Sequence, residues 1–282
     1  MASTSPAVKF AAAVLLAVSS GISPSFSQES GGVLRVHHQD SPASMSIIEE
    51  ATYSTVVPMM GVFNNLVMYK QDVPQNSMKS IVPDLAISWS WNEEGTELTF
   101  PLRQGVKWHD GKSFTAADVK CTFDLLMGKA DHKLRINPRK SWYVNVAEVT
   151  TNGDYETTFH LKRPQPSFLA LLATSWSPIY PCHVRPRDMR SHPIGTGPFK
   201  FVEFQPNEHI TVTRNPDYWK KDRPYLAGIE YTIIKDVSTR LLSFIAHQPK
   251  KAMSLRESAR PSAPGWGRCP RLACGVPAKC VG

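Results

Sequence analysis

Residues 98–128 read LTFPLRQGVKWHDGKSFTAADVKCTFDLLMG, and this stretch contains a strand, a turn and a helix in direct succession. Apolar residues alternate over 98–103, which predicts a strand. Pro101 donates no backbone N–H, so we expect this strand at the edge of a sheet. Asp110-Gly111 then marks a turn.

The same stretch continues with the clearest helix of the chain. Thr115 followed three residues later by Asp118 forms a capping-box pattern, and apolar residues recur at positions 119, 123 and 126. Gly128 supplies the usual end signal. Because the strand, the turn and the helix are each marked locally, this segment predicts a fold that mixes strands and helices.

The flanking segments continue this alternation. Asn152-Gly153-Asp154 separates two strand patterns and predicts a hairpin. Ser167 is a candidate cap for a short helix after it. Strands are expected at 33–37, 143–150, 155–161, 199–204, 209–214 and 229–234. Helices are expected at 168–173 and from Ser238, the latter with Leu241, Leu242 and Ile245 on one face. A helix is also expected at 47–69, where the spacing of Ile48, Val56, Met60, Phe63 and Val67 on one apolar face is helical, although Pro58 weakens the pattern. Interleaved strands and helices predict an α/β or α+β protein.

Composition narrows the possible classes of protein. The chain has 282 residues, of which 41% are apolar, so it can form a packed core and is not disordered as a whole. Its net charge is +8, but residues 248–282 hold seven of the 32 Lys and Arg and one of the 24 Asp and Glu. The basic excess therefore belongs mainly to this segment and gives no support to nucleic-acid binding by the rest of the chain.

The N-terminus has the pattern of an export signal. Lys9 precedes an apolar stretch over 10–18, which is too short to span a membrane, and small residues follow. We expect cleavage after Ser27. Since no cysteine lies near that position, the sequence predicts a soluble exported protein rather than a lipoprotein. Export leads to an oxidising compartment in which cysteines can pair.

Four stretches together are specific to one protein family. Their order and spacing match the pattern of that family throughout residues 30–247. The stretches are PDLAISW with NEEGTELTF (83–100), LRQGVKWHDG with FTAADV (102–119), PIGTGPF (193–199), and RNPDYW with PYL and GI (214–229). In these residues the chain resembles the extracellular solute-binding proteins of family 5, the peptide- and nickel-binding components of ATP-driven importers.

The resemblance implies an α/β clamshell of the type II periplasmic-binding-protein kind, of which only the N-terminal half is present. Residues 28–50 and 186–247 then belong to lobe one, and residues 51–185 to its small subdomain. The helix from Ser238 leads toward lobe two. After about His247 the pattern stops, and we interpret 248–282 as an aberrant Pro- and Cys-rich tail that follows a frameshift or premature end. Capture of a ligand is expected to be impaired in such a chain.

The resemblance also implies a function without catalysis or cofactors. We expect a monomeric periplasmic protein that holds a peptide or another small solute and delivers it to membrane permease subunits. A buried peptide needs partners for its amide groups, which Asn, Ser and backbone groups supply. The expected ligand-binding residues are Gln39, Asp40, Ser41, Asn64, Asn65, Trp176, Thr196 and Gly197. For Asp40 and Ser41 a simple Asx-type turn is an equal alternative.

Other motifs leave alternatives open. The His37, His38, His183 and His192 set suggests a metal-binding protein or metalloenzyme, although no zinc-type spacing supports it. Cys121 and Cys182 form a disulfide or remain two buried thiols. Gly195-Thr196-Gly197 is interpreted as a tight turn rather than a phosphate loop. Trp108-His109-Asp110-Gly111 is likewise interpreted as a turn and not as a catalytic His–Asp pair.

Overall fold

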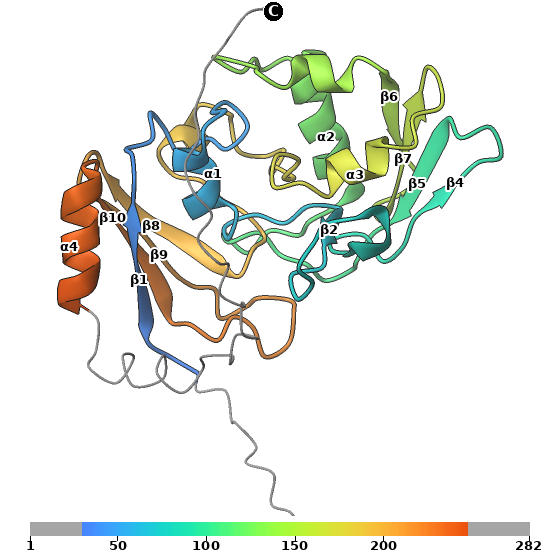
Figure 1. Ribbon diagram of the computed structural model, residues 1–282. Coiled ribbons are helices and arrows are strands. Elements are labelled where there is room, and N and C mark those ends of the chain that lie inside the picture. The colour runs from blue at the N-terminus through green and yellow to red at the C-terminus, as the bar shows by residue number, and fades with distance from the viewer. Residues whose placement is uncertain (1–29, 248–282) are drawn as a thin grey trace, which may run out of the picture.

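The computed structural model describes residues 30–247, and these form two four-stranded sheets with short helices and a small two-stranded sheet between them (Figure 1). Buried apolar side chains from both four-stranded sheets belong to one continuous core. The predicted signal peptide and the tail at 248–282 lie outside the described residues. None of the described helices is long and apolar enough to cross a membrane.

The first sheet joins the beginning and the end of the described chain. Its strand order is β1-β10-β9-β8, with β1 parallel to β10 and the other neighbours antiparallel. The β8–β9 turn contains Asn207 at φ 65°. All four strands had been expected from the alternation of apolar residues. Their bounds are Val33–His38 (β1), Phe199–Gln205 (β8), His209–Arg214 (β9) and Gly228–Ile233 (β10).

The second sheet has the order β4-β5-β7-β6 and is antiparallel throughout. The predicted hairpin is confirmed, with Gly153 at φ 65° in the turn between β6 and β7. The strands are Ser90–Trp91 (β4), Glu97–Pro101 (β5), Val146–Thr151 (β6) and Glu156–Leu161 (β7), and the separate pair is Val67–Tyr69 (β2) and Ile81–Pro83 (β3).

The predicted edge position of the strand around Pro101 is wrong, because β5 lies between β4 and β7. Pro101 is the last residue of β5, and β4 pairs only with Thr99 and Leu98. The carbonyl of Pro101 accepts a hydrogen bond from the Ile87 N–H at 2.8 Å. The missing N–H of Pro101 therefore lies beyond the end of β4 and costs the sheet no hydrogen bond.

The helix α2 (Ala116–Met127) packs on the second sheet as its sequence predicts. The Phe123 ring meets the Phe159 ring edge-to-face, with centroids 4.7 Å apart. The Thr115 N–H donates to the Asp118 carboxylate at 2.9 Å, and Gly128 adopts φ 77° at the C-terminal end. Both predicted end signals are therefore confirmed.

The expected helix over 47–69 is mostly wrong. The helix α1 covers only Tyr53–Met59, and β2 begins at Val67. Met60, placed by the helical pattern on a buried face, is 50% exposed. The physical reason is that residues 44–50 enter the core as an irregular buried segment, so no single helix face runs through the whole stretch.

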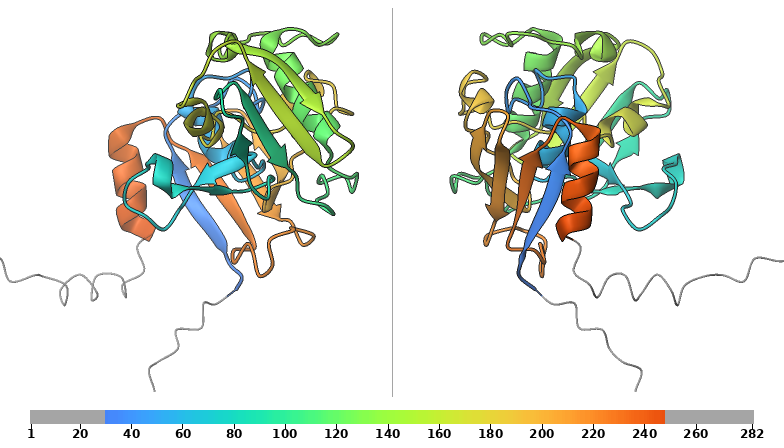
Figure 2. Two further views of the ribbon diagram at one scale, coloured as in Figure 1. Left: turned by 90° about the vertical axis from the view of Figure 1, so that its right-hand side faces the viewer. Right: turned by 60° about the vertical axis from the view of Figure 1, so that its left-hand side comes forward.

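The two remaining helices were expected. The short helix α3 (Phe168–Leu172) is present, but Ser167 makes no side-chain cap hydrogen bond. The helix α4 (Val237–His247) begins after Asp236, whose carboxylate accepts the Thr239 N–H at 2.7 Å. Figure 2 shows α4 beside β1, where the side chains predicted to share an apolar face are exposed, at 58% for Leu241, 66% for Leu242 and 61% for Ile245. Short 3-10 helices cover Met78–Ser80, Lys140–Tyr143 and Asp188–Arg190.

Of the two alternatives for the cysteines, the structure has the disulfide. Cys121 of α2 is bonded to Cys182, and their Cα atoms are 5.7 Å apart. The Cys182 N–H also donates to Asp118 at 2.8 Å. The disulfide therefore ties the loop before the 3-10 helix at 188–190 to the middle of α2. The predicted division of the chain into lobe segments stays a prediction.

Candidate functional site

Asp84 is the centre of a buried polar network at the end of α1. One carboxylate oxygen accepts the Asn64 side-chain amide at 2.9 Å and the Asn65 backbone N–H at 3.1 Å, and the other meets the Lys220 ammonium at 2.5 Å. The Asp84 side chain is only 3% exposed. Because a buried carboxylate needs such partners, this network fixes three distant segments of the chain together.

Thr196 connects this network to the Gly195-Thr196-Gly197 turn. Its hydroxyl donates to the Asn64 side-chain oxygen at 3.2 Å. A Cβ atom at Gly195 would lie 1.9 Å from the Val62 carbonyl oxygen, and one at Gly197 would lie 2.5 Å from the Val62 carbonyl carbon. Both glycines therefore allow two backbone segments to touch, which accords with the predicted tight turn.

His109 holds the other side of this turn. Its Nδ1 accepts the Gly195 N–H at 3.3 Å, so its Nε2 carries the proton donated to the Gly197 carbonyl at 3.0 Å. Burial lowers the pKa of His109 to about 4, and the positive charge of Lys200 adds to this effect. Neutral His109 is thus part of the structure that supports Thr196 and Gly197.

Asp110 does not pair with His109 but with His183, whose Nε2 lies 2.7 Å from the carboxylate. Partial burial opposes ionisation of Asp110, but hydrogen bonds from His183 and the Lys112 N–H outweigh it and lower the pKa of Asp110. The Gly111 N–H donates to the Trp108 carbonyl at 2.8 Å. The interpretation of Trp108-His109-Asp110-Gly111 as a turn is confirmed.

Asn65 connects the same region to the loop after α3. Its side-chain amide donates to the Thr174 carbonyl at 2.6 Å and to the Leu172 carbonyl at 3.3 Å. The side-chain amide groups of Asn64 and Asn65 thus make hydrogen bonds within the protein. Their position supports a role in forming the walls of a site, and direct contact with a ligand stays a prediction.

These walls enclose a hollow of about 250 Å³ between the end of α1, the loop after α3 and the segment after β9. Tyr218 is one of its walls and accepts a hydrogen bond from Asn64 at 3.3 Å; burial raises the pKa of its hydroxyl. The lining includes Met60, Gly61, Phe63, Asn64, Asn65, Gln71, Asp84, Ser175, Tyr218 and Lys220. Apolar walls with a few fixed polar groups are typical of ligand sites.

Trp176 lies next to this hollow, one residue after Ser175, in a cluster of aromatic rings. Its centroid is 5.9 Å from that of Tyr53 and 6.4 Å from that of Trp142. The Arg139 guanidinium lies 4.7 Å from the Trp176 centroid, and burial lowers the pKa of Arg139. Of these four residues only Trp176 was expected from the sequence to contact a ligand. Tyr53, Trp142 and Arg139 lie on other segments of the chain, and no local sequence pattern indicates that these segments come together.

Gln39, Asp40 and Ser41 follow β1 and do not line the hollow. The Asp40 carboxylate accepts the Ser41 N–H at 2.8 Å, and the Ser41 hydroxyl accepts the Asn207 N–H at 3.0 Å. These bonds fix the loop against the β8–β9 turn and favour the local-turn alternative for Asp40 and Ser41. Ligand contact by this loop stays a prediction.

The four histidines considered for a metal are not brought together. His38 Nε2 lies 3.0 Å from the Ser54 carbonyl, His183 pairs with Asp110, and His192 lies beside Ser191. Within residues 30–247 no group of three or more His, Cys, Asp or Glu residues is arranged to hold a metal ion.

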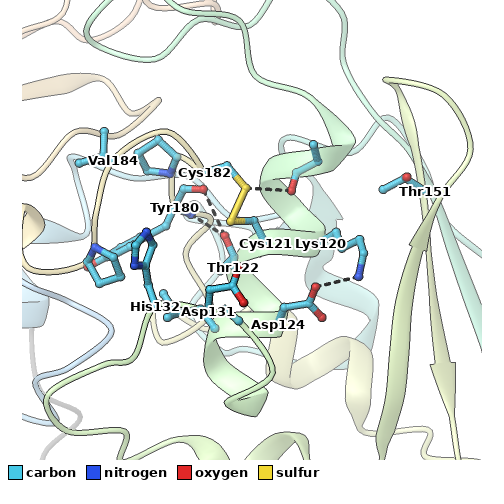
Figure 3. A pocket seen from close by; sticks show the side chains of 15 residues that line it. Lys120, Cys121, Thr122, Asp124, Asp131, His132, Thr151, Tyr180, Cys182 and Val184 are labelled. Carbon is cyan, nitrogen blue, oxygen red and sulfur yellow. Dashed lines mark hydrogen bonds and ion pairs between the residues drawn. A yellow bond between two sulfur atoms is a disulfide. The ribbon is translucent and has the colours of Figure 1, made fainter.

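A second hollow of about 390 Å³ lies beside the disulfide (Figure 3). Lys120 and Asp124 on its α2 wall form an ion pair with each other at 2.7 Å, and Thr122 bonds the backbone of Tyr180. None of the predicted ligand-binding residues lines it. We therefore take the smaller hollow, where Asn64, Asn65 and the Asp84 network meet, as the candidate site.

Comparison with known proteins gives the site a context. The family described as "Bacterial extracellular solute-binding proteins, family 5 Middle" matches residues 80–258. Di/tripeptide-binding protein 1 of Pseudomonas aeruginosa is 29% identical over 201 residues, which are 64% of this chain and 36% of that protein. Oligopeptide-binding protein AppA of Bacillus subtilis is 36% identical over 156 residues, which are 51% of this chain and 27% of that protein.

Solved structures show the same likeness. The periplasmic binding protein DppA of Helicobacter pylori, in complex with the peptide STSA, has a TM-score of 0.70 at 25% identity and covers 83% of this chain and 50% of its own. AppA of Bacillus subtilis, with a nonapeptide, has a TM-score of 0.67 at 28% identity and covers 77% of this chain and 43% of its own. The chain thus spans about a third of its curated relatives and half or less of these structures. The predicted α/β fold of periplasmic binding proteins is confirmed.

Proposed function

Because the chain belongs to family 5 of the bacterial extracellular solute-binding proteins, we propose that it binds peptides outside the cytoplasm without converting them chemically. Relatives that carry the names of di/tripeptide- and oligopeptide-binding proteins support peptides as the solute class. Binding of this kind requires a shaped surface and fixed polar groups, and no nucleophile or general base.

The observation that carries this proposal is the hollow beside the Asp84 network. Its polar walls are held in place because Asn64 and Lys220 are each bonded to the buried Asp84 carboxylate. Gln71 and Ser175 also line the hollow, and their side chains are of the kind that pairs with peptide amide groups. A preformed hollow of this kind lowers the entropic cost of binding.

Delivery to membrane permease subunits, a periplasmic location and a monomeric state are further parts of the proposal. The description of the Helicobacter pylori protein as associated with an ABC transporter supports the first. The cleavage site near Ser27 lies outside the described residues, and impaired capture of the ligand stays a prediction.

Thermal denaturation of the 282-residue chain tests the proposal. A mixture of di- to nonapeptides is expected to raise the melting temperature, because a ligand that binds only the folded state stabilises it. Hydrogen exchange should slow in residues 60–65 and 173–178 around the hollow. Free amino acids, a sugar and a nickel–histidine complex serve as comparisons. A response to one of these comparisons but not to peptides would contradict the assignment of peptides.

A further inference from the structure

The helix α1 buries Val56, Pro58 and Met59 together with two hydroxyl residues, and it leaves other large apolar side chains exposed. Ser54 and Thr55 are buried, whereas Tyr53 is 66% exposed, Val57 37% and Met60, just after the helix, 50%. Positions 53, 57 and 60 are spaced by four and three residues, so these side chains share one helix face. A surface helix normally turns large apolar side chains such as these toward the core.

The inward polar groups of α1 are satisfied, so this arrangement belongs to the packed structure. The Thr55 hydroxyl donates to the Ser44 carbonyl at 3.1 Å, and the Ser54 hydroxyl lies 2.7 Å from that of Thr52. The protein thus buries hydroxyl groups at α1 while it leaves three large apolar side chains in water. Contiguous exposed apolar surface of this kind marks binding sites.

The exposed face of α1 connects the aromatic cluster to the candidate site. At one end Met60 lines the hollow. At the other end the Tyr53 ring contacts Trp176, which contacts Trp142, itself 40% exposed. We call the surface formed by Tyr53, Val57, Met60 and Trp142 the apolar strip.

The aromatic end of the apolar strip is held rigidly from behind. Arg139 is 1% exposed, and its guanidinium stacks over Trp176 while it donates to the carbonyls of Ile48 and Glu50. Those two carbonyls belong to the buried segment that leads into α1. The rings are therefore fixed relative to the helix before any ligand arrives, which favours tight contact with a rigid apolar group.

We propose that the apolar strip is the subsite for one bulky aromatic or aliphatic side chain of a peptide ligand, whose backbone reaches the hollow. This inference rests on the proposed function and adds selectivity to it. The strip contains no charged residue, so an acidic or basic side chain would lose water there without gaining a partner. An alanine side chain would leave most of the apolar surface in water.

Calorimetric titration of the full chain with Ala-Phe-Ala and Ala-Ala-Ala tests this proposal. The wild type is expected to bind Ala-Phe-Ala about tenfold more tightly, because a Phe ring buries far more apolar surface than a methyl group. The double substitution Tyr53→Ser/Val57→Ser changes two residues of the strip that do not line the hollow. It should bring this ratio close to one and leave the affinity for Ala-Ala-Ala unchanged. Met78→Gln, at an exposed methionine outside the strip (51%), should retain the tenfold ratio.

The outcomes separate the two proposals. If the wild type binds neither peptide and the mixture of di- to nonapeptides does not raise its melting temperature, the proposed function itself is wrong for this chain. If it binds both equally, or if the double variant keeps the preference for Ala-Phe-Ala, the apolar strip is not the subsite and peptide binding stands. A dimer that the double variant dissociates, with an unchanged peptide preference, would assign the strip to a second copy of the chain.

Discussion

The Asp84 carboxylate and the Lys220 ammonium lie 2.5 Å apart, although 136 positions separate them in the sequence. Their ion pair fastens the segment after β9 to the loop that carries Asn64 and Asn65. Since the Asp84 side chain is almost fully buried, its charge depends on this partner and on the amide donors around it.

We expect Lys220→Met to lower the free energy of unfolding by about 2 kcal/mol. Removal of one partner of a fully buried pair costs roughly 3–5 kcal/mol, but the Lys220 side chain is 31% exposed and Asp84 keeps two other donors. Urea denaturation measures the change. Lys221→Met, at the exposed neighbouring position, is the control and should alter stability by less than about 0.5 kcal/mol. Equal effects of the two substitutions would contradict the role of the pair.

The disulfide is expected to contribute about 3 kcal/mol to stability. It closes a loop of 61 residues, and a crosslink of this length restricts the unfolded chain strongly. The variant Cys121→Ala/Cys182→Ala should therefore unfold at lower urea concentration than the wild type. Dithiothreitol should destabilise the wild type but not this variant. A wild-type transition that is insensitive to the reductant would show that the bond contributes nothing.

Much of the fold follows from local sequence signals. The helix α2 was predicted with both ends because Thr115, Asp118 and Gly128 act on the backbone within a few residues of themselves. The hairpin around Gly153 was predicted for the same reason. Such elements need no information about distant parts of the chain.

The helix α1 and the aromatic cluster could not be predicted in this way. Thr55 points inward and donates to the carbonyl of Ser44, and Trp176 packs against Arg139 of another segment, so both depend on contacts between segments that lie apart in the sequence. A hydrophobic pattern assumes that apolar residues face the core, so it placed Met60 inside. The assumption fails at the exposed apolar residues of the apolar strip. Such failures are expected at functional surfaces.

The stability of the protein should fall between pH 6.5 and pH 4 because of His109. Its folded-state pKa is lowered to about 4 by burial, whereas an unfolded histidine titrates near 6.5. Between pH 6.5 and pH 4, His109 binds a proton in the unfolded state but not in the folded state, so a fall in pH favours unfolding. The full effect, reached near pH 4, is about 3 kcal/mol.

His109→Gln tests this assignment. Urea denaturation at intervals from pH 8 to pH 4 should show a shallower loss of stability for the variant than for the wild type, since one titrating group is removed. His132→Gln, at an exposed histidine, is the matched control and should retain the wild-type slope. If His109→Gln also retains the wild-type slope, another group accounts for the pH dependence.

Gly197→Ala is expected to disrupt the turn that carries Thr196. Its Cβ would lie 2.5 Å from the Val62 carbonyl carbon and 2.6 Å from the Gly61 carbonyl oxygen, and backbone atoms cannot move aside as a flexible side chain can. We expect a loss of about 3 kcal/mol or more in the free energy of unfolding. Gly61→Ala is the matched control, because its Cβ would meet only the Phe199 ring, at 3.2 Å. Its cost should be below about 1 kcal/mol, and a Gly197→Ala variant as stable as this control would mean that the two backbone segments do not need their close approach.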